Sequence, residues 1–263
     1  MNRRSFLQNT VGIAALASCQ RPTTKTSKGL RFAVASDGHY GQPNTPYQQN
    51  FEEIITNLKA EKEANGLDFV VFNGDLFHDD IKFLPEVKTY FDRLKMPYYV
   101  TRGNHDHVSP SLWKQTWGYE LNSTVNIGDY GLILADTSNE KGEYLCPDIG
   151  FIENSLAKMS LKKAVFLFMH IPYKKWTPHG VTCLELEQLL AKYPNLKAAF
   201  HGHDHGIDVA KIAEKPFFFD GHFGGNWGVS YRGYRVVDVR AEGECKTYQF
   251  DPQSKTKINE NSI

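Results

Sequence analysis

The sequence predicts an α/β fold built around one large domain. Short apolar segments rich in β-branched and aromatic residues alternate with segments of helical periodicity up to about residue 200, and short strands separated by turns follow. Two of the strand segments, 67–73 and 164–169, are almost entirely apolar, which is typical of strands covered on both faces. A chain of 263 residues is long enough for one domain with a full core.

The order of the expected elements follows from these patterns. The segment 47–65 has apolar residues at helical spacing (Phe51, Ile54, Ile55 and Leu58) and ends at Asn65-Gly66, so we expect a helix there. The segment 109–126 is aromatic without clear periodicity, and we expect irregular packing segments; the segment from Pro252 is polar, and we expect a frayed tail. The other expected strands are 30–36, 96–101, 130–135, 164–169 and 196–200, and the other expected helices are 85–94, 151–159 and 181–193.

Charge and cysteine content exclude several classes of function. Thirty Lys and Arg residues balance 30 Asp and Glu residues, so we expect no bulk binding to nucleic acid or to anionic membranes. The four cysteines are Cys19, Cys146, Cys183 and Cys245, and none has the Cys-x-x-Cys spacing of a thiolate zinc site.

The N-terminus resembles an export signal. Residues 2–8 (Asn-Arg-Arg-Ser-Phe-Leu-Gln) are similar to a twin-arginine signal, and the apolar segment 11–17 is too short to span a bilayer. Leu16-Ala17-Ser18-Cys19 resembles a bacterial lipobox; in that family of signals the peptide is cut before the cysteine, whose thiol and new amine are acylated. Residues 1–28 are then a signal and a flexible tether of an exported lipoprotein in the periplasm or cell envelope. The alternative is an ordinary signal peptide in which Cys19 stands by chance.

Residues able to bind metal follow five of the expected strands. Because strand ends on one edge of a sheet converge, we expect these side chains to lie together. On extended backbone, Asp-x-His and His-x-His each direct both side chains to one side. Taken singly, an Asp-x-His motif is more often a surface turn and a lone histidine more often a core residue. The residues are Asp37 and His39, Asp75, Asn104, His170, and His203 with His205.

The number and type of these donors predict a pair of metal ions. Three or more imidazoles, two carboxylates and an amide are too many for one ion, and they suit two ions that share a carboxylate. Nitrogen and oxygen donors without thiolate favour manganese, iron, zinc or cobalt. Two such ions about 3.5–4 Å apart form a clamp for in-line phosphoryl displacement.

The motifs Asp-x-His, Gly-Asp, Gly-Asn-His-Asp, His and Gly-His-x-His, in this order, resemble the calcineurin-like metallophosphoesterase superfamily. The resemblance runs from Leu30 to about Phe250. It implies a four-layer α/β sandwich of two mixed β-sheets flanked by helices, in a domain at 29–251 followed by the tail at 252–263. It also implies a metal-dependent phosphoric ester hydrolase, a phosphodiesterase or phosphomonoesterase acting on a small-molecule phosphoester.

The resemblance also implies roles for single residues. Asp37, His39 and His205 would hold the first ion, Asn104, His170 and His203 the second, and Asp75 would bridge them. A hydroxide bridging the metals would attack phosphorus. His105 would contact the substrate and assist the leaving group, with Asp106 orienting its imidazole, and Asn104 would also lie near the substrate.

Several alternatives stay open at this point. His78 stands where some relatives have a tyrosine ligand, so we expect no tyrosinate-bound ferric iron; His78 either contacts substrate or is solvated. His222 either contacts substrate or belongs to a β-turn. A non-catalytic binding module on the same fold is the alternative function. A metal-storage role does not explain Asn104 or the His105-Asp106 pair.

The lipobox interpretation makes a direct prediction. Replacing Cys19 with Ala removes the acylated thiol, so the variant should leave the membrane fraction and appear in the soluble fraction. Membrane fractionation followed by immunoblotting measures this, and a Cys19→Ala protein that still sediments with membranes would show that no lipid anchor is attached at this residue.

Overall fold

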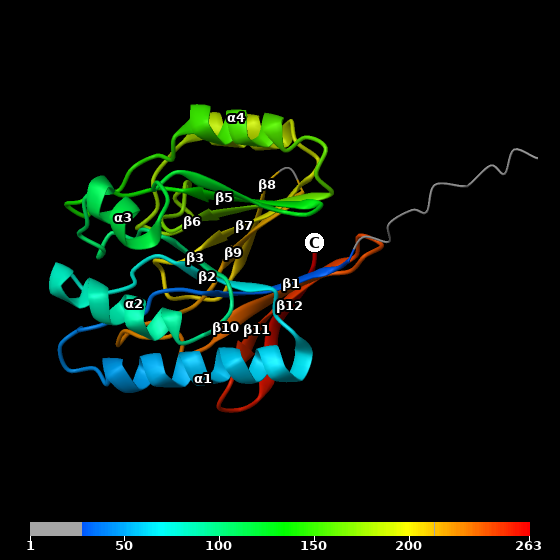
Figure 1. The fold of residues 1–263 in the computed structure, drawn as a ribbon. Coiled ribbons are helices and arrows are strands. Elements are labelled where there is room, and N and C mark those ends of the chain that lie inside the picture. Colours follow the sequence, from blue (N-terminus) through cyan, green and yellow to red (C-terminus); the bar gives the residue numbers. More distant parts are fainter. Residues whose placement is uncertain (1–27, 213) are drawn as a thin grey trace, which may run out of the picture.

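Two six-stranded β-sheets form the centre of the structure, a computed structural model that describes residues 28–212 and 214–263 (Figure 1). The predicted signal, including Cys19, lies outside the described residues. The first sheet has the order β12-β11-β10-β1-β2-β3, and the second has the order β4-β5-β6-β7-β9-β8. The strands of the first sheet are β1 (Leu30–Ala35), β2 (Phe69–Asn73), β3 (Tyr98–Thr101), β10 (Tyr234–Val239), β11 (Cys245–Asp251) and β12 (Thr256–Ser262). Those of the second are β4 (Ser123–Ile127), β5 (Tyr130–Ala135), β6 (Ala164–Met169), β7 (Leu196–His201), β8 (Val209–Ile212) and β9 (Lys215–Phe219).

Parallel strands occupy part of each sheet and set the position of the loops that follow them. Strands β1, β2 and β3 pair in parallel, as do β5, β6, β7 and β9. Antiparallel strands complete both sheets: β10 to β12 extend the first, while β4 and β8 form the edges of the second. The carboxyl ends of the parallel strands in each sheet therefore open on one edge.

The alternation of side chains along each strand builds a three-part core. On β1, Phe32 and Val34 pack between the sheets, while Ala33 and Ala35 face the helices. Aromatic residues fill the space between the sheets, where Phe32 of β1 meets Phe166 of β6 edge to face at a ring-centroid distance of 5.1 Å. The two sheets are thereby joined by a dry, apolar interface.

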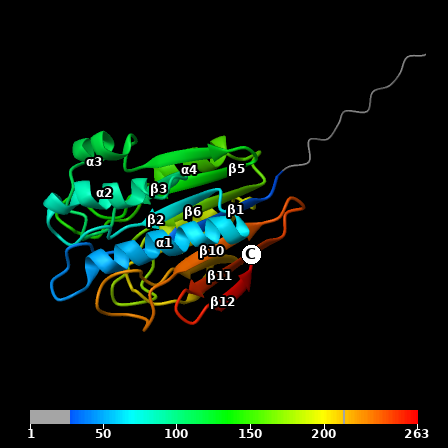
Figure 2. The same ribbon diagram turned by 60° about the horizontal axis from the view of Figure 1, so that its bottom comes forward.

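Helices cover the outer faces of both sheets, which gives the four layers seen in Figures 1 and 2. Helices α1 (Tyr47–Asn65), α2 (Leu84–Asp92, preceded by a 3₁₀ turn at Ile81–Phe83) and α3 (Pro110–Trp117) pack on the first sheet. Helices α4 (Ile149–Lys158) and α5 (Leu184–Ala191) pack on the second. The predicted apolar face of α1 is buried, and the predicted fold class is confirmed.

Two expectations about local structure are wrong. The segment 109–126 contains α3 and β4, because Ser109 caps the helix by accepting a hydrogen bond from the Leu112 amide, Pro110 begins it, and Gly118 ends it in the left-handed conformation. The polar segment from Pro252 is not frayed: it forms β12, which pairs with β11 at the edge of the first sheet. Its polar side chains suit an exposed edge strand.

A disulfide joins the loop after β5 to the segment before α5, through Cys146 and Cys183. Cys245 is a buried free thiol, which agrees with the odd number of cysteines beyond residue 19.

In the part of the chain that the structure describes, no helix is both long enough and apolar enough to cross a membrane.

The disulfide closes a segment with a sequence separation of 37 residues, so it restricts the unfolded chain. Replacing both Cys146 and Cys183 with Ser should lower the free energy of unfolding by roughly 2–4 kcal/mol and the Tm by several degrees. Thermal unfolding with and without dithiothreitol measures this. The reductant should lower the Tm of the wild-type protein and leave that of the double variant unchanged, whereas an equal response of both proteins would contradict the assignment.

Candidate metal centre

The predicted metal ligands lie in the loops that leave the carboxyl ends of the strands, but not on extended backbone. Asp37 (φ 57°), His39 (φ 44°) and Asp75 (φ 50°) adopt left-handed conformations. So do His203 (φ 72°) and His205 (φ 52°). The expectation that Asp-x-His and His-x-His act as extended pairs is therefore wrong, because the chain has already turned away from the strand. Such backbone is sparsely populated by residues other than glycine, and its accumulation is typical of functional sites.

Glycines allow these loops to approach one another. A Cβ atom at Gly103 would overlap with the Asp75 carboxylate, and one at Gly202 would overlap with the Ser36 hydroxyl and press on Asp37. The glycines of the Gly-Asn-His-Asp and Gly-His-x-His motifs are thus required by close contact between loops.

The loops bring six of the seven predicted ligands into two compact groups. Within each group the candidate donor atoms all lie within 4.8 Å of one another. The first group is Asp37, His39 and His205, in which Nε2 of His205 lies 3.0 Å from Nε2 of His39 and 3.3 Å from Oδ1 of Asp37. The second group is Asp75, His170 and His203.

Asp75 belongs to the second group and also contacts the first. Its Oδ2 atom lies 3.2 Å from Nε2 of His170 in the second group and 3.5 Å from Nε2 of His39 in the first. Its other oxygen accepts a hydrogen bond of 2.8 Å from the backbone amide of His105. This is the position that a carboxylate shared by two ions would need.

Two buried side-chain atoms at this site, Oδ1 of Asn104 and Nε2 of His203, have no hydrogen-bond or ion-pair partner among the described residues. Leaving a buried polar atom unpaired costs about 1–3 kcal/mol each. Asn104 is held at the site by its neighbours, since Gly103 and His105 both contact Asp75. The unpaired atoms and the nitrogen and oxygen donor set fit a bound transition metal.

In His170 and His205, the ring nitrogen Nδ1 faces a backbone carbonyl of the protein. Nδ1 of His170 lies 2.8 Å from the Asn73 carbonyl, and Nδ1 of His205 lies 3.0 Å from the Trp227 carbonyl. Such contacts fix the ring orientation and leave Nε2 to face the metal position.

Burial and neighbouring charges favour the protonation states in which most of these groups can bind a metal ion, which are the ionised carboxylate and the neutral imidazole. Although burial acts to raise it, the imidazoles of His205 and His170 lower the pKa of Asp37 to about 2. Burial lowers the pKa of His39 to about 3. Burial acts to lower the pKa of His170 as well, but the carboxylates of Asp75 and Asp37 raise it to about 10. A cation at this position therefore competes with a proton on His170.

His105 lies beside the two groups with a partner that the sequence did not reveal. Its Nδ1 atom lies 2.7 Å from Oδ1 of Asp79, and its ring stacks on that of His78 at 4.7 Å. Burial opposes the shift, but Asp75 and Asp79 raise the pKa of His105 above its ordinary value. Asp79 lies four residues after Asp75 in the same loop, which made it a possible partner of His105. Nothing in the sequence, however, favoured Asp79 over Asp106 for this contact.

The expectation that Asp106 orients His105 is wrong. Both oxygens of the buried Asp106 carboxylate accept hydrogen bonds from backbone amides: Oδ1 from Leu76 and Phe77, and Oδ2 from Gly103. Asp106 thus ties the loop after β2 to the loop after β3, and its charge is one of the smaller contributions to the raised pKa of His105.

His78 and His222 support candidate ligands. Nδ1 of His78 lies 3.1 Å from Nδ1 of His39, so His78 is part of the site and not simply solvated. His222 is buried, with both ring nitrogens facing the backbone carbonyls of Gly224 and Val229 and its ring stacked on His205 at 4.9 Å. The expectation that His222 contacts substrate is therefore wrong, because its polar atoms are already engaged.

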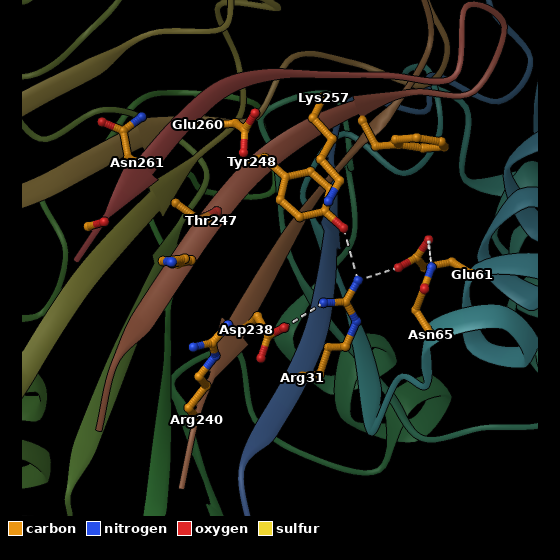
Figure 3. Close-up of a pocket in the computed structure, with 13 residues that line it drawn as sticks. Arg31, Glu61, Asn65, Asp238, Arg240, Thr247, Tyr248, Lys257, Glu260 and Asn261 are labelled. Carbon is orange, nitrogen blue, oxygen red and sulfur yellow. Dashed lines mark hydrogen bonds and ion pairs between the residues drawn. The ribbon is translucent and has the colours of Figure 1, made fainter. Parts of the chain in front are cut away.

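A pocket of about 670 Å³ lies elsewhere, on the face of β10, β11 and β12 near the end of α1 (Figure 3). Its central charge is already paired: the Arg31 guanidinium bonds Glu61 at 2.5 Å and Asp238 at 2.9 Å. It contains none of the candidate metal ligands.

Residues 30–206 match the family profile described as "Calcineurin-like phosphoesterase", which is more than half of the chain. The chain belongs to the calcineurin-like phosphoesterase family. All seven predicted metal ligands of this phosphoesterase lie within the matched residues.

Individual relatives of this phosphoesterase include phosphatases. Tartrate-resistant acid phosphatase type 5 of Rattus norvegicus is 27% identical over 239 residues, covering 73% of this chain and 70% of the relative. A dimetal phosphatase from Danio rerio has the same fold, with a TM-score of 0.70 at 10% identity over 90% of this chain and 99% of that one. The purple acid phosphatase PPD1 of yellow lupin has a TM-score of 0.65 at 14% identity, over 90% of this chain and 54% of that one.

The shared position of Asp75 yields a prediction about metal content. Asp75→Asn keeps an oxygen that can accept the His105 amide but removes the charge between the two groups, so the purified phosphoesterase should lose bound metal. Elemental analysis after reconstitution with Mn²⁺ measures this, and Asp79→Asn, which removes a nearby half-exposed carboxylate, should retain wild-type metal content. Full metal content in Asp75→Asn would refute the bridging position.

Proposed function

We propose that this phosphoesterase hydrolyses small-molecule phosphate esters with two transition-metal ions, held by Asp37, His39 and His205 and by Asn104, His170 and His203, with Asp75 shared. The observation that carries the proposal is the contact of one buried carboxylate with both donor groups. Ions bound there would polarise phosphoryl oxygens and lower the pKa of bound water.

His105 is suited to assist the leaving group. Its side chain is 27% exposed, so a substrate can reach it, and it lies against the ring of His39 at 4.9 Å. Asp79 fixes Nδ1, which leaves Nε2 to donate a proton to the departing oxygen. The pKa of His105 is raised above its ordinary value, which favours the protonated form that general-acid catalysis needs.

Export to an oxidising compartment belongs to the same proposal. The N-terminal motifs suggest a lipid-anchored protein of the periplasm or cell envelope, and the Cys146–Cys183 disulfide supports it, because disulfides persist mainly outside the reducing cytosol. The lipid at Cys19 would then be the contact with the membrane.

His105→Ala should retain metal and lose activity by about 10²–10⁴-fold, the usual contribution of a general acid. Assays with 4-nitrophenyl phosphate and bis(4-nitrophenyl) phosphate on Mn²⁺-reconstituted protein measure this and also show whether monoesters or diesters are preferred. Wild-type turnover in His105→Ala would remove this residue from the chemistry.

Asp79→Asn separates the proton-donor role of His105 from a structural one. Because Asp79 raises the pKa of His105, its replacement should lower that pKa, so the alkaline limb of the pH profile of kcat/KM should move to lower pH. An unchanged alkaline limb would mean that this limb reports the titration of a group other than His105, which would contradict the proton-donor role.

A further inference from the structure

Two exposed aromatic side chains stand beside the candidate metal centre. Six large hydrophobic side chains are recorded as exposed in the described part of the chain, and two of them are aromatic: Tyr144 and Trp227, each 40% exposed. Both contact the imidazole of a candidate ligand. Ligand-binding sites are lined mainly by hydrophobic and aromatic side chains, so exposed aromatic rings beside a candidate reaction centre are candidates for contact with a substrate.

Trp227 borders the first donor group. Its ring stacks on His205 at 4.0 Å with an interplanar angle of 15° and leans against His39 at 4.8 Å. Its backbone carbonyl faces Nδ1 of His205, and Gly228 lies so close that a Cβ atom there would overlap with His205. The indole is thereby held in place while 40% of the residue stays open to solvent.

Tyr144 borders the second donor group. Its ring meets that of His203 edge to face at 4.8 Å. The loop that carries it is held by a bridge between Ser138 and Tyr144 and by a hydrogen bond of 2.8 Å from the Leu145 amide to the Thr137 carbonyl. Two residues after Tyr144, the chain is joined to Cys183 by the disulfide. This loop is therefore tethered on both sides of the tyrosine.

The two rings end a row of side chains in contact. The row runs from Trp227 through His205 and His39 to Asp75, and on through His170 and His203 to Tyr144. A phosphoryl group placed at Asp75 would leave its organic substituent within reach of an aromatic wall at either end.

We infer that Trp227 and Tyr144 form the walls of a substrate subsite that selects phosphate esters of a planar organic group, such as an aryl or nucleoside group. The inference rests on the proposed function, since it assumes that the phosphoryl group binds between the two donor groups. A planar ring gains stacking energy on an aromatic wall that an alkyl chain of similar size gains only in part. The preference for one organic group over another would then be set by the two loops that carry Tyr144 and Trp227, and not by the candidate metal ligands.

Equilibrium binding of two non-hydrolysable probes to the Mn²⁺-reconstituted protein tests this. Methylphosphonate reports the phosphoryl position alone, and phenylphosphonate adds a planar ring. We expect phenylphosphonate to bind at least about fivefold more tightly. It should also change the tryptophan fluorescence of the wild-type protein, and this change should be absent in Trp227→Leu. The ring of one bound probe contacts one wall, so either Trp227→Leu or Tyr144→Leu should reduce this preference, with the affinity for methylphosphonate and the metal content unchanged; a preference kept by both variants would overturn the subsite. Tyr144→Phe and the exposed-site control Leu161→Ala should keep the preference.

The outcomes separate the two proposals. Equal affinities of the wild-type protein for the two probes, or leucine variants that weaken both probes alike, would overturn the subsite. Failure of both probes to bind the metal-loaded protein would instead count against the proposed function itself. Hydrolysis of adenosine 5′-monophosphate compared with ribose 5-phosphate then distinguishes a nucleoside from a simple aryl group: a preference for the nucleotide that Trp227→Leu removes supports the subsite for nucleosides.

Discussion

The structure depends on the burial of two carboxylates, Asp37 and Asp75, at the edge where the two sheets present their loops. Both are almost fully excluded from water, and an ionised carboxylate in such a position needs compensating positive charge. The surrounding imidazoles supply part of it, since Nε2 of His170 lies 3.2 Å from Asp75, but Oδ1 of Asn104 and Nε2 of His203 remain without partners among the described residues. A bound cation satisfies both the charge and the unpaired atoms.

The fold serves this requirement through its parallel strands. Ligand-bearing loops leave the carboxyl ends of strands in both sheets, so the centre lies where the two sheets meet, and the aromatic core between them fixes their separation. The loops then turn through left-handed residues and meet at glycines, while Asp106 ties two of them together through backbone amides. The geometry of the candidate site is thus set by backbone contacts as much as by the candidate ligands.

The sequence predicted the fold class, and six of the seven candidate metal ligands that it singled out lie together in the structure, because strand periodicity and ordered motifs are local signals. It failed where the outcome depended on tertiary contacts. Asp106 and Asp79 are both plausible partners of His105, and only the fold shows that backbone amides occupy the first. The segment that forms β12 is polar and has the composition of a disordered tail. It is a strand because it pairs with β11. Tyr144 and Trp227 lie far from any motif, and their proximity to the ligands arises from folding.

The central claim is that two ions share Asp75. Anomalous diffraction from crystals of the Mn²⁺-reconstituted protein, recorded at the manganese absorption edge, tests it most directly. The account predicts two anomalous peaks on either side of the Asp75 carboxylate, one among Asp37, His39 and His205 and the other among Asn104, His170 and His203. A single peak, or peaks at other residues with none beside Asp75, would contradict it.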